Sequence, residues 1–250
     1  MTPLEGLAVA GAGLVAGAMN TAVGSGTLVT FPVLLAVGYP PVLANVSNGI
    51  GLLPGSITGA FGYRRELAGQ RTRVVRLAAT TAVGAIAGAV LLLVLPSDAF
   101  EAIVPVLVLL AVLLVLVQPW IARRLAERRD RPEHGGPWLL TGIFLTGTYG
   151  GYFGASQGVI ALALMGITLQ EDLQRLNATK NVLTATAYLV SGVVFVLVAE
   201  VAWLAVVLLA AGATIGGPLG ARYGRRLPPA LLRGLIVLVG LVAVVQLAID

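Results

Sequence analysis

Small polar side chains gather at two glycine-rich interruptions of long apolar stretches. The stretch 4–38 is interrupted at Gly24-Ser25-Gly26, and the stretch 137–168 is interrupted between Gly150 and Gly154. Both are too long for one spanning helix of about 20 residues, so each is expected to form two helical pieces that meet at a turn. The residues expected to contact a ligand there are Asn20, Gly24, Ser25, Gly26 and Thr27 in the first half, and Gly154, Ser156 and Gln157 in the second.

The chemistry that these breaks offer is the binding of an anion. A half-helix that begins after a break directs free N–H groups and the positive end of its dipole at the gap, which suits an oxyanion. Catalysis is not expected, because no span holds a histidine to activate Ser25, no carboxylate lies at mid-membrane depth, and the chain has no cysteine. We therefore predict a protein that is not an enzyme and that needs no metal or other cofactor.

A second polar set lies on predicted helices further along each half. Its members are Asn45, Ser47 and Asn48, and Asn177, Thr179, Lys180 and Asn181. Side chains three residues apart share a helix face, so the two ends of Asn45–Asn48, like those of Asn177–Lys180, could present paired donors to one ligand. Interhelical hydrogen bonding is the alternative role for the asparagines. For Lys180, ligand contact and snorkelling to the lipid headgroups are both open.

The elements that carry these residues must lie in lipid. Of the 250 residues, 58% are hydrophobic and 11% are charged, whereas about 25% of an ordinary soluble domain is charged. So few charged side chains do not cover a water-soluble fold of this size, and the chain is predicted to be a polytopic, all-α membrane protein. The clear spans besides the two broken stretches are 41–61, 74–95, 100–121, 177–199, 201–221 and 230–249.

The basic residues indicate which side of the membrane each loop faces. All 16 Lys and Arg residues fall in four clusters, whereas the turns near Asp98 and Glu200 carry none. The clusters are 64–76, 123–131, 175–180 and 222–233. By the positive-inside rule the clusters lie in the cytoplasm, and the acidic turns and both termini lie outside. This placement accounts for a sequence pI near 10.1 without a nucleic-acid partner.

The two halves of the chain match weakly but in the same order. The paired segments are Gly17–Gly24 with Gly147–Gly154, Asn45–Asn48 with Asn177–Lys180, Gly84–Gly88 with Gly212–Gly216, and Leu95-Pro96 with Leu227-Pro228. Equivalent loops have opposite charge character, since 62–76 is basic and its counterpart near 200 is not. We therefore predict two inverted repeats of about five membrane helices or half-helices each, at 1–121 and 137–250, joined by a cytoplasmic basic linker at 122–136.

Two features of this topology have alternatives. Eight plain helices with parallel halves would instead place Arg222 and its basic neighbours outside. Each broken stretch either crosses the membrane twice or re-enters. Glycines at small-xxx-small spacing, such as Gly13/Gly17 and Gly84/Gly88, predict close helix packing rather than ligand contact.

The order of these segments resembles one family of bacterial membrane permeases. The segments are Gly17 through Gly26, Pro32, the Gly38-Tyr-Pro-Pro turn, Ala44-Asn-Val-Ser-Asn48 and Tyr63-Arg64-Arg65, then Gly147 to Gly158, Asn177-Ala-Thr-Lys180 and Gly212-Ala-Thr-Ile-Gly216. Together they are similar to the sulfite exporter TauE/SafE family, which implies a transporter of sulfite, sulfonates or related sulfur oxyanions, commonly outward. The family's glycine-rich run is altered here by Ser25 and, in the second copy, by Gln157, which leaves the exact substrate open.

The residues and the resemblance together predict a permease that binds sulfite or a small organosulfonate between the paired breaks and works by alternating access. Its partners would be this small sulfur oxyanion and the lipid bilayer of the bacterial cytoplasmic membrane. A passive small-anion channel and a non-transporting membrane scaffold are the alternatives. The sequence leaves open the transport direction, the coupling ion and the formation of a homo-oligomer.

Overall fold

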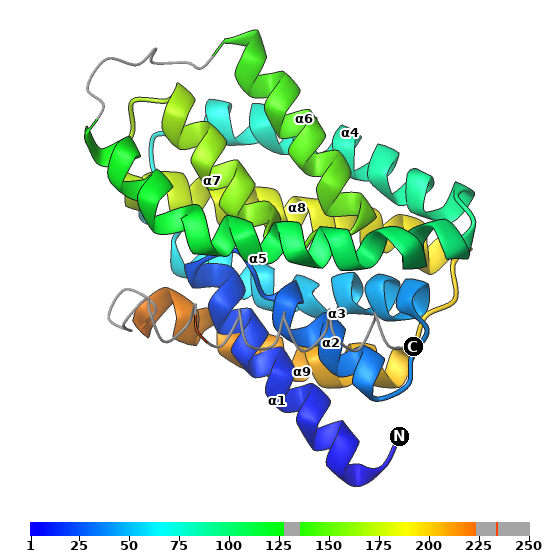
Figure 1. Cartoon of the computed structure of the whole chain (residues 1–250). Helices are drawn as coiled ribbons and strands as arrows, with labels where there is room; N and C mark the ends of the chain where they lie inside the picture. The colour runs from blue at the N-terminus through cyan, green and yellow to red at the C-terminus, as the bar shows by residue number, and fades with distance from the viewer. Residues whose placement is uncertain (128–135, 224–233, 235–250) are drawn as a thin grey trace.

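The computed structural model describes residues 1–127, 136–223 and 234, and in this part of the chain it contains helices and no strand. Before residue 128 the helices are α1 (Pro3–Ala22), α2 (Thr27–Ala36), α3 (Pro41–Gly62), α4 (Arg71–Val94) and α5 (Ser97–Glu127). After residue 135 they are α6 (Pro137–Tyr152), α7 (Gln157–Thr168), α8 (Leu173–Val198) and α9 (Trp203–Tyr223). The predicted all-α architecture is confirmed for these residues (Figure 1).

Four of the described helices are long and apolar enough to cross a membrane, as expected for a multi-pass membrane protein. They are α4, the segment Ser97–Gln118 of α5, α8 and α9. α3 begins and ends within one residue of the predicted span 41–61 but is not one of the four, because asparagine, serine and glycine dilute its apolar residues. α5 continues past residue 121, so the beginning of the predicted linker 122–136 is helical. Apart from residue 234, the predicted span 230–249 lies outside the described residues.

Both long apolar stretches are broken where their glycines predict. The first break (residues 23–26) separates α1 from α2, and the second break (residues 153–156) separates α6 from α7. In each break a glycine has a positive φ, +94° at Gly24 and +78° at Gly154, and its N–H donates at 3.0 Å to the carbonyl five residues earlier. Glycine adopts this left-handed backbone without the penalty that a Cβ would bring. The turns predicted from the sequence are therefore confirmed in both halves.

The chain reverses direction at each break, so that α1–α2 and α6–α7 each form a hairpin. Gly26 lies against α1, where a Cβ built on it would be 2.5 Å from the carbonyl oxygen of Ala16. In the second hairpin, Gly142 of α6 lies against the Leu164 side chain of α7. In Figure 1 the α1–α2 hairpin opens to the lower right and the α6–α7 hairpin to the upper left.

Glycines let the first helix of each hairpin pack closely on a long helix of the other half. A Cβ on Gly17 of α1 would be 2.5 Å from the carbonyl oxygen of Ala213 in α9, which is closer than packed atoms allow. Gly88 of α4 lies in the same way against Thr148 of α6. The packing role predicted from the small-xxx-small spacing is confirmed at these positions.

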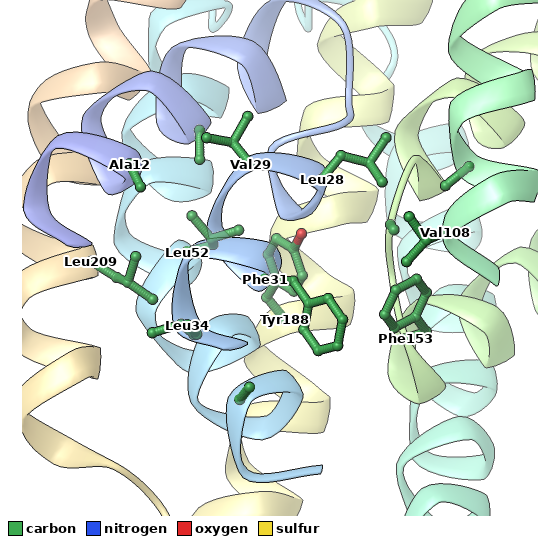
Figure 2. Packing of buried hydrophobic residues seen from close by; sticks show 14 of the residues in the cluster. Ala12, Leu28, Val29, Phe31, Leu34, Leu52, Val108, Phe153, Tyr188 and Leu209 are labelled. Carbon is green, nitrogen blue, oxygen red and sulfur yellow. The ribbon is translucent and has the colours of Figure 1, made fainter. Parts of the chain in front are cut away.

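The largest apolar core surrounds the two breaks. Phe31 of α2, Val108 of α5, Phe153 of the second break and Tyr188 of α8 belong to it (Figure 2). Within lipid such contacts stabilise through van der Waals packing rather than through exclusion of water. The breaks are therefore held in a packed interior.

An ion-pair cluster joins the two halves at the end of the bundle that holds the basic α3–α4 loop. Glu171, in the turn between α7 and α8, accepts hydrogen bonds from Arg73 Nη1 of α4 at 2.8 Å and from Arg175 Nε of α8 at 2.7 Å. Burial raises the pKa of Glu171, but the hydrogen bonds and charges of the two arginines outweigh it and hold the pKa below the ordinary 4.5. The ionised carboxylate therefore stabilises the folded chain.

Replacing this carboxylate is expected to remove stability at neutral pH only. Glu171→Gln should lower the free energy of unfolding by about 1–2 kcal/mol at pH 7, because two charge-assisted hydrogen bonds are lost. The depressed pKa means that this stabilisation is complete above about pH 4.5 and disappears as the pH falls through the lower folded-state pKa. Thermal unfolding in detergent should show the wild type and the variant converging at acidic pH. Glu200→Gln, in the exposed α8–α9 turn, is the control. A difference in thermal stability between the wild type and Glu171→Gln that does not change with pH would contradict a stabilising role of the ionised carboxylate.

Candidate functional site

The two breaks meet inside the bundle. Gly24 of the first break packs on Gly158 in the first turn of α7, and a Cβ on Gly24 would lie 2.7 Å from the Gly158 Cα. The side chains of Ser25 and Gln157 beside this contact are buried. Non-helical backbone survives at membrane depth only where protein covers it or where it lines a wet cavity. We call this contact region the junction.

Lys180 of α8 brings a positive charge to the junction. Its side chain is 0% exposed, and its stem passes Gly158. Its Nζ donates to the carbonyl oxygens of Asn20 and Thr21, both at 3.0 Å. These carbonyls belong to the last turn of α1, the negative end of that helix's dipole. Snorkelling is therefore the wrong interpretation of Lys180, because its ammonium group is directed inward.

Within the part of the chain that the structure describes, no carboxylate balances the charge of Lys180. No carboxylate of the described residues lies within ion-pair distance of its Nζ. An ammonium has three donors, and the two that are used here go to neutral carbonyls. Buried charges in proteins are normally paired, because an unpaired one loses its hydration without compensation. The junction is therefore electrostatically suited to an anion.

Asn45 of α3 donates to the end of α6 in the second hairpin, as Lys180 donates to the end of α1 in the first hairpin. Its Nδ2 donates at 2.8 Å to the carbonyl oxygen of Tyr152, which is the last residue of α6. In each half a long helix thus reaches across to the other half and caps the first helix of its hairpin. The interhelical hydrogen bonding that was the alternative role for the asparagines is confirmed for Asn45.

Thr27, Asn48 and Tyr188 form a hydrogen-bonded group at the start of α2. Thr27 Oγ1 lies 3.0 Å from the Tyr188 hydroxyl and accepts from Asn48 Nδ2 at 3.3 Å. The Tyr188 ring also lies against Gly154, so this side chain contacts both hairpins. Sequence reasoning missed Tyr188, although it follows Asn181 by seven residues, a spacing that keeps both on one face of α8.

Two polar atoms at the junction have no hydrogen-bond partner among the residues that the structure describes. The Ser25 hydroxyl and Gln157 Oε1 are buried and unpaired, and such groups cost about 1–3 kcal/mol unless a ligand or water satisfies them. Ser156 is turned away, because its hydroxyl donates at 3.1 Å to the carbonyl oxygen of Ala111 in α5. α2 and α7 both begin without a side-chain cap. The N–H groups of Leu28, Val29, Gln157 and Val159 donate to carbonyls of the breaks, which leaves those of Thr27 and Gly158 in the two first turns for a ligand.

The structure does not bring every predicted residue to the junction. Ser47 accepts a hydrogen bond at 2.9 Å from the Ala202 N–H beside α9, and Thr179 donates at 3.2 Å to the Arg175 carbonyl within α8. Asn20 donates at 2.9 Å to the Ser56 hydroxyl of α3. Asn177 Oδ1 and Asn181 Nδ2 are buried and unpaired on α8. Gly26 packs on α1, and Gly154 supplies the turn of the second break.

Apolar helices that enclose two broken hairpins and a polar junction are typical of a multi-pass membrane transporter. The chain belongs to the sulfite exporter TauE/SafE family, which matches residues 9–247. The resemblance stated from the sequence is therefore confirmed.

Relatives of the chain carry the same general description. The chain is 29% identical over 239 residues to the probable membrane transporter protein YfcA of Escherichia coli (strain K12), which covers 95% of this chain and 87% of that protein. A probable membrane transporter protein of Haemophilus influenzae is 26% identical over 238 residues, 95% of this chain and 92% of that protein. Probable membrane transporter protein ORF9 of Sinorhizobium sp is 26% identical over 245 residues, 96% of this chain and 90% of that protein. No solved structure matches the chain.

Proposed function

We propose that this chain transports sulfite or a small organosulfonate across the bacterial cytoplasmic membrane and binds the anion at the junction. The observation that carries the proposal is the buried ammonium of Lys180, which has no carboxylate partner among the described residues. The unpaired Ser25 hydroxyl and the first-turn N–H groups of Thr27 and Gly158 add donors at the two breaks. A sulfite or sulfonate group has three oxygens and a negative charge, so it can accept from a cation and from several neutral donors at once.

The packing of the helices supports two inverted repeats around this site. α1 packs on α9 as α6 packs on α4, and α3 packs on α9 as α8 packs on α4. Each pair becomes the other when α1–α4 are exchanged with α6–α9. With the basic loops in the cytoplasm, α1–α2 would re-enter from outside, α6–α7 would re-enter from inside, and both termini would lie outside. Movement of one hairpin against the other would then open the junction to the two sides in turn.

The transport activity itself is the test of this proposal. Purified protein in liposomes is expected to carry labelled sulfite or a small sulfonate with a rate that saturates and that unlabelled substrate competes. Flux that rises without saturation would instead indicate a passive channel. Absence of flux with sulfite and with several sulfonates would reject the substrate class, and absence of flux with any anion would indicate a scaffold.

Two serine variants connect this flux to the junction. Ser25→Ala should raise the half-saturating substrate concentration about fivefold, because one hydrogen bond to the anion worth about 1 kcal/mol is lost. Ser47→Ala removes the same hydroxyl on α3, where it serves the Ala202 N–H instead of the junction. It should lower thermal stability and leave the half-saturating concentration unchanged. If Ser25→Ala and Ser47→Ala change the half-saturating concentration equally, the anion does not bind at the first break.

A further inference from the structure

We infer that a polar path for the hydrated oxyanion runs along α8 from one end of the bundle to the junction, and that aromatic side chains close the other end. The basic face is the end that holds the α3–α4 loop and Arg175, and the acidic face is the end that holds Asp98 and Glu200. The inference rests on the proposed function. Thr184 then belongs to the groups that contact the anion, and the anion reaches these groups from the basic face.

A row of unpaired polar atoms on α8 carries the first part of the inference. Its members are Gln174 Oε1, Asn177 Oδ1, Asn181 Nδ2 and Thr184 Oγ1. Their spacing of three, four and three residues places them on one face of the helix. The row starts one residue after α8 begins at the basic face and ends one turn before Tyr188, which contacts both hairpins. It therefore connects the basic face with the junction.

The chemistry of the row suits an anion that travels with water. Asn177, Asn181 and Thr184 are 7%, 4% and 3% exposed, so bulk solvent at the surface of the bundle does not satisfy them. The Asn181 amide and the Thr184 hydroxyl are donors, whereas the free oxygens of Gln174 and Asn177 are acceptors. The donors can bind an oxyanion directly, and bridging water can satisfy the acceptors. Four unpaired polar atoms on one face of a helix are unusual in a packed interior, where buried polar groups are normally paired.

Among the described residues, the corresponding face of α3 has no row of unpaired polar atoms, because beyond Asn45, whose amide donates to the Tyr152 carbonyl, its residues are apolar or glycine. The sequence match of Asn45 with Asn177 makes Gly49 the counterpart of Asn181 and Leu52 the counterpart of Thr184. Leu52 is 1% exposed within the main apolar core. A polar path toward the acidic face, equivalent to the one on α8, is therefore not built on α3.

Aromatic rings close the acidic face of the junction. Phe153 of the second break makes edge-to-face contacts with Phe31 of α2 at 5.3 Å and with Phe100 of α5 at 6.2 Å between ring centroids. Phe100 also contacts Tyr152 at 5.6 Å. Phe100 lies in the first turn of α5, directly after the acidic turn, so these rings lie between the second break and the acidic face. The unpaired row therefore lies on the side of the basic face, and the aromatic rings cover the junction on the side of the acidic face.

Single cysteines test the path, because the native chain has none. In proteoliposomes of known orientation, Thr184→Cys should react with a membrane-impermeant, anionic methanethiosulfonate faster from the basic face than from the acidic face. Leu183→Cys, its buried neighbour in the apolar cluster with α6 and α7, is the matched control and should stay unlabelled. Leu52→Cys should resist the reagent from the acidic face until Phe100→Ala is added. Faster labelling of Thr184→Cys from the acidic face than from the basic face, or equal labelling of Thr184→Cys and Leu183→Cys, would overturn the path.

A second measurement does not depend on labelling. Thr184→Val keeps the shape of the side chain and should lower the sulfite transport rate about fivefold, the equivalent of about 1 kcal/mol. Thr186→Val is the control, because the Thr186 hydroxyl donates to the Val182 carbonyl of its own helix and faces away from the row. Sulfite flux that is unchanged by Thr184→Val would overturn the path and leave the proposed function standing. Preferential labelling of Thr184→Cys from the basic face without sulfite or sulfonate flux would support the path and reject the sulfur oxyanion.

Discussion

Lys180→Met is expected to reduce sulfite transport at least about thirtyfold, because removal of one partner of a buried charge interaction costs about 2 kcal/mol or more. Methionine fills nearly the same space in the Gly158 contact but supplies neither a charge nor a donor. The anion then loses its balancing charge, and the carbonyls of Asn20 and Thr21 lose their hydrogen-bond donor. Initial rates of labelled sulfite uptake into proteoliposomes measure the loss.

The loss of charge must be separated from the loss of the helix cap. Asn45→Ala removes a neutral cap from the end of α6, as Lys180→Met removes a charged one from the end of α1. Both variants should lower thermal stability, since Asn45→Ala leaves one helix-end carbonyl without its donor and Lys180→Met leaves two. Only Lys180→Met should lose transport by the larger factor, and Lys180→Arg should recover part of it. If Lys180→Met and Asn45→Ala lose equal amounts of transport and equal amounts of thermal stability, Lys180 is a structural cap and the proposed anion site is wrong.

The breaks of this fold are predictable from the sequence because their cause is local. Gly24 and Gly154 each end a helix with a positive φ, which only glycine adopts at low cost, and both lie in apolar stretches too long for one helix. Composition and spacing therefore predict where the chain leaves the helix. The same local argument predicts the close packing at Gly17, since small residues one turn apart mark a surface that another helix can approach.

The hydrogen-bond partners of the polar residues lie far away along the chain, so they are not predictable from one sequence. Lys180 caps carbonyls of Asn20 and Thr21, about 160 residues away along the chain, and main-chain carbonyls leave no mark in the sequence. Asn45 and Ser47 are neighbours with similar chemistry, but α3 turns one toward α6 and the other toward the start of α9. Only the packing of α3 and α8 against the hairpins decides which polar group reaches the junction.

Gly24→Ala is expected to lower the free energy of unfolding by more than about 3 kcal/mol and to reduce transport at least about tenfold, because two penalties combine. The first is backbone strain, since Gly24 has a φ of +94°. The second is steric, since the new Cβ would lie 2.7 Å from the Cα and 2.9 Å from the carbonyl carbon of Gly158. Both atoms are backbone, so the clash is relieved only by moving α7 away from the first break.

Two further glycines separate these penalties. Gly38 has the same φ of +94° with nothing within 4 Å of a built Cβ, so Gly38→Ala reports the strain alone and should cost about 1–2 kcal/mol. Gly158 is helical, and Gly158→Ala therefore reports the contact without the strain, with a Cβ 2.7 Å from the Gly24 Cα. Thermal unfolding and sulfite flux of the three variants should show that Gly158→Ala loses transport whereas Gly38→Ala keeps it. If Gly38→Ala and Gly158→Ala were to lose transport equally, the close approach of the two hairpins would not be what shapes the anion site.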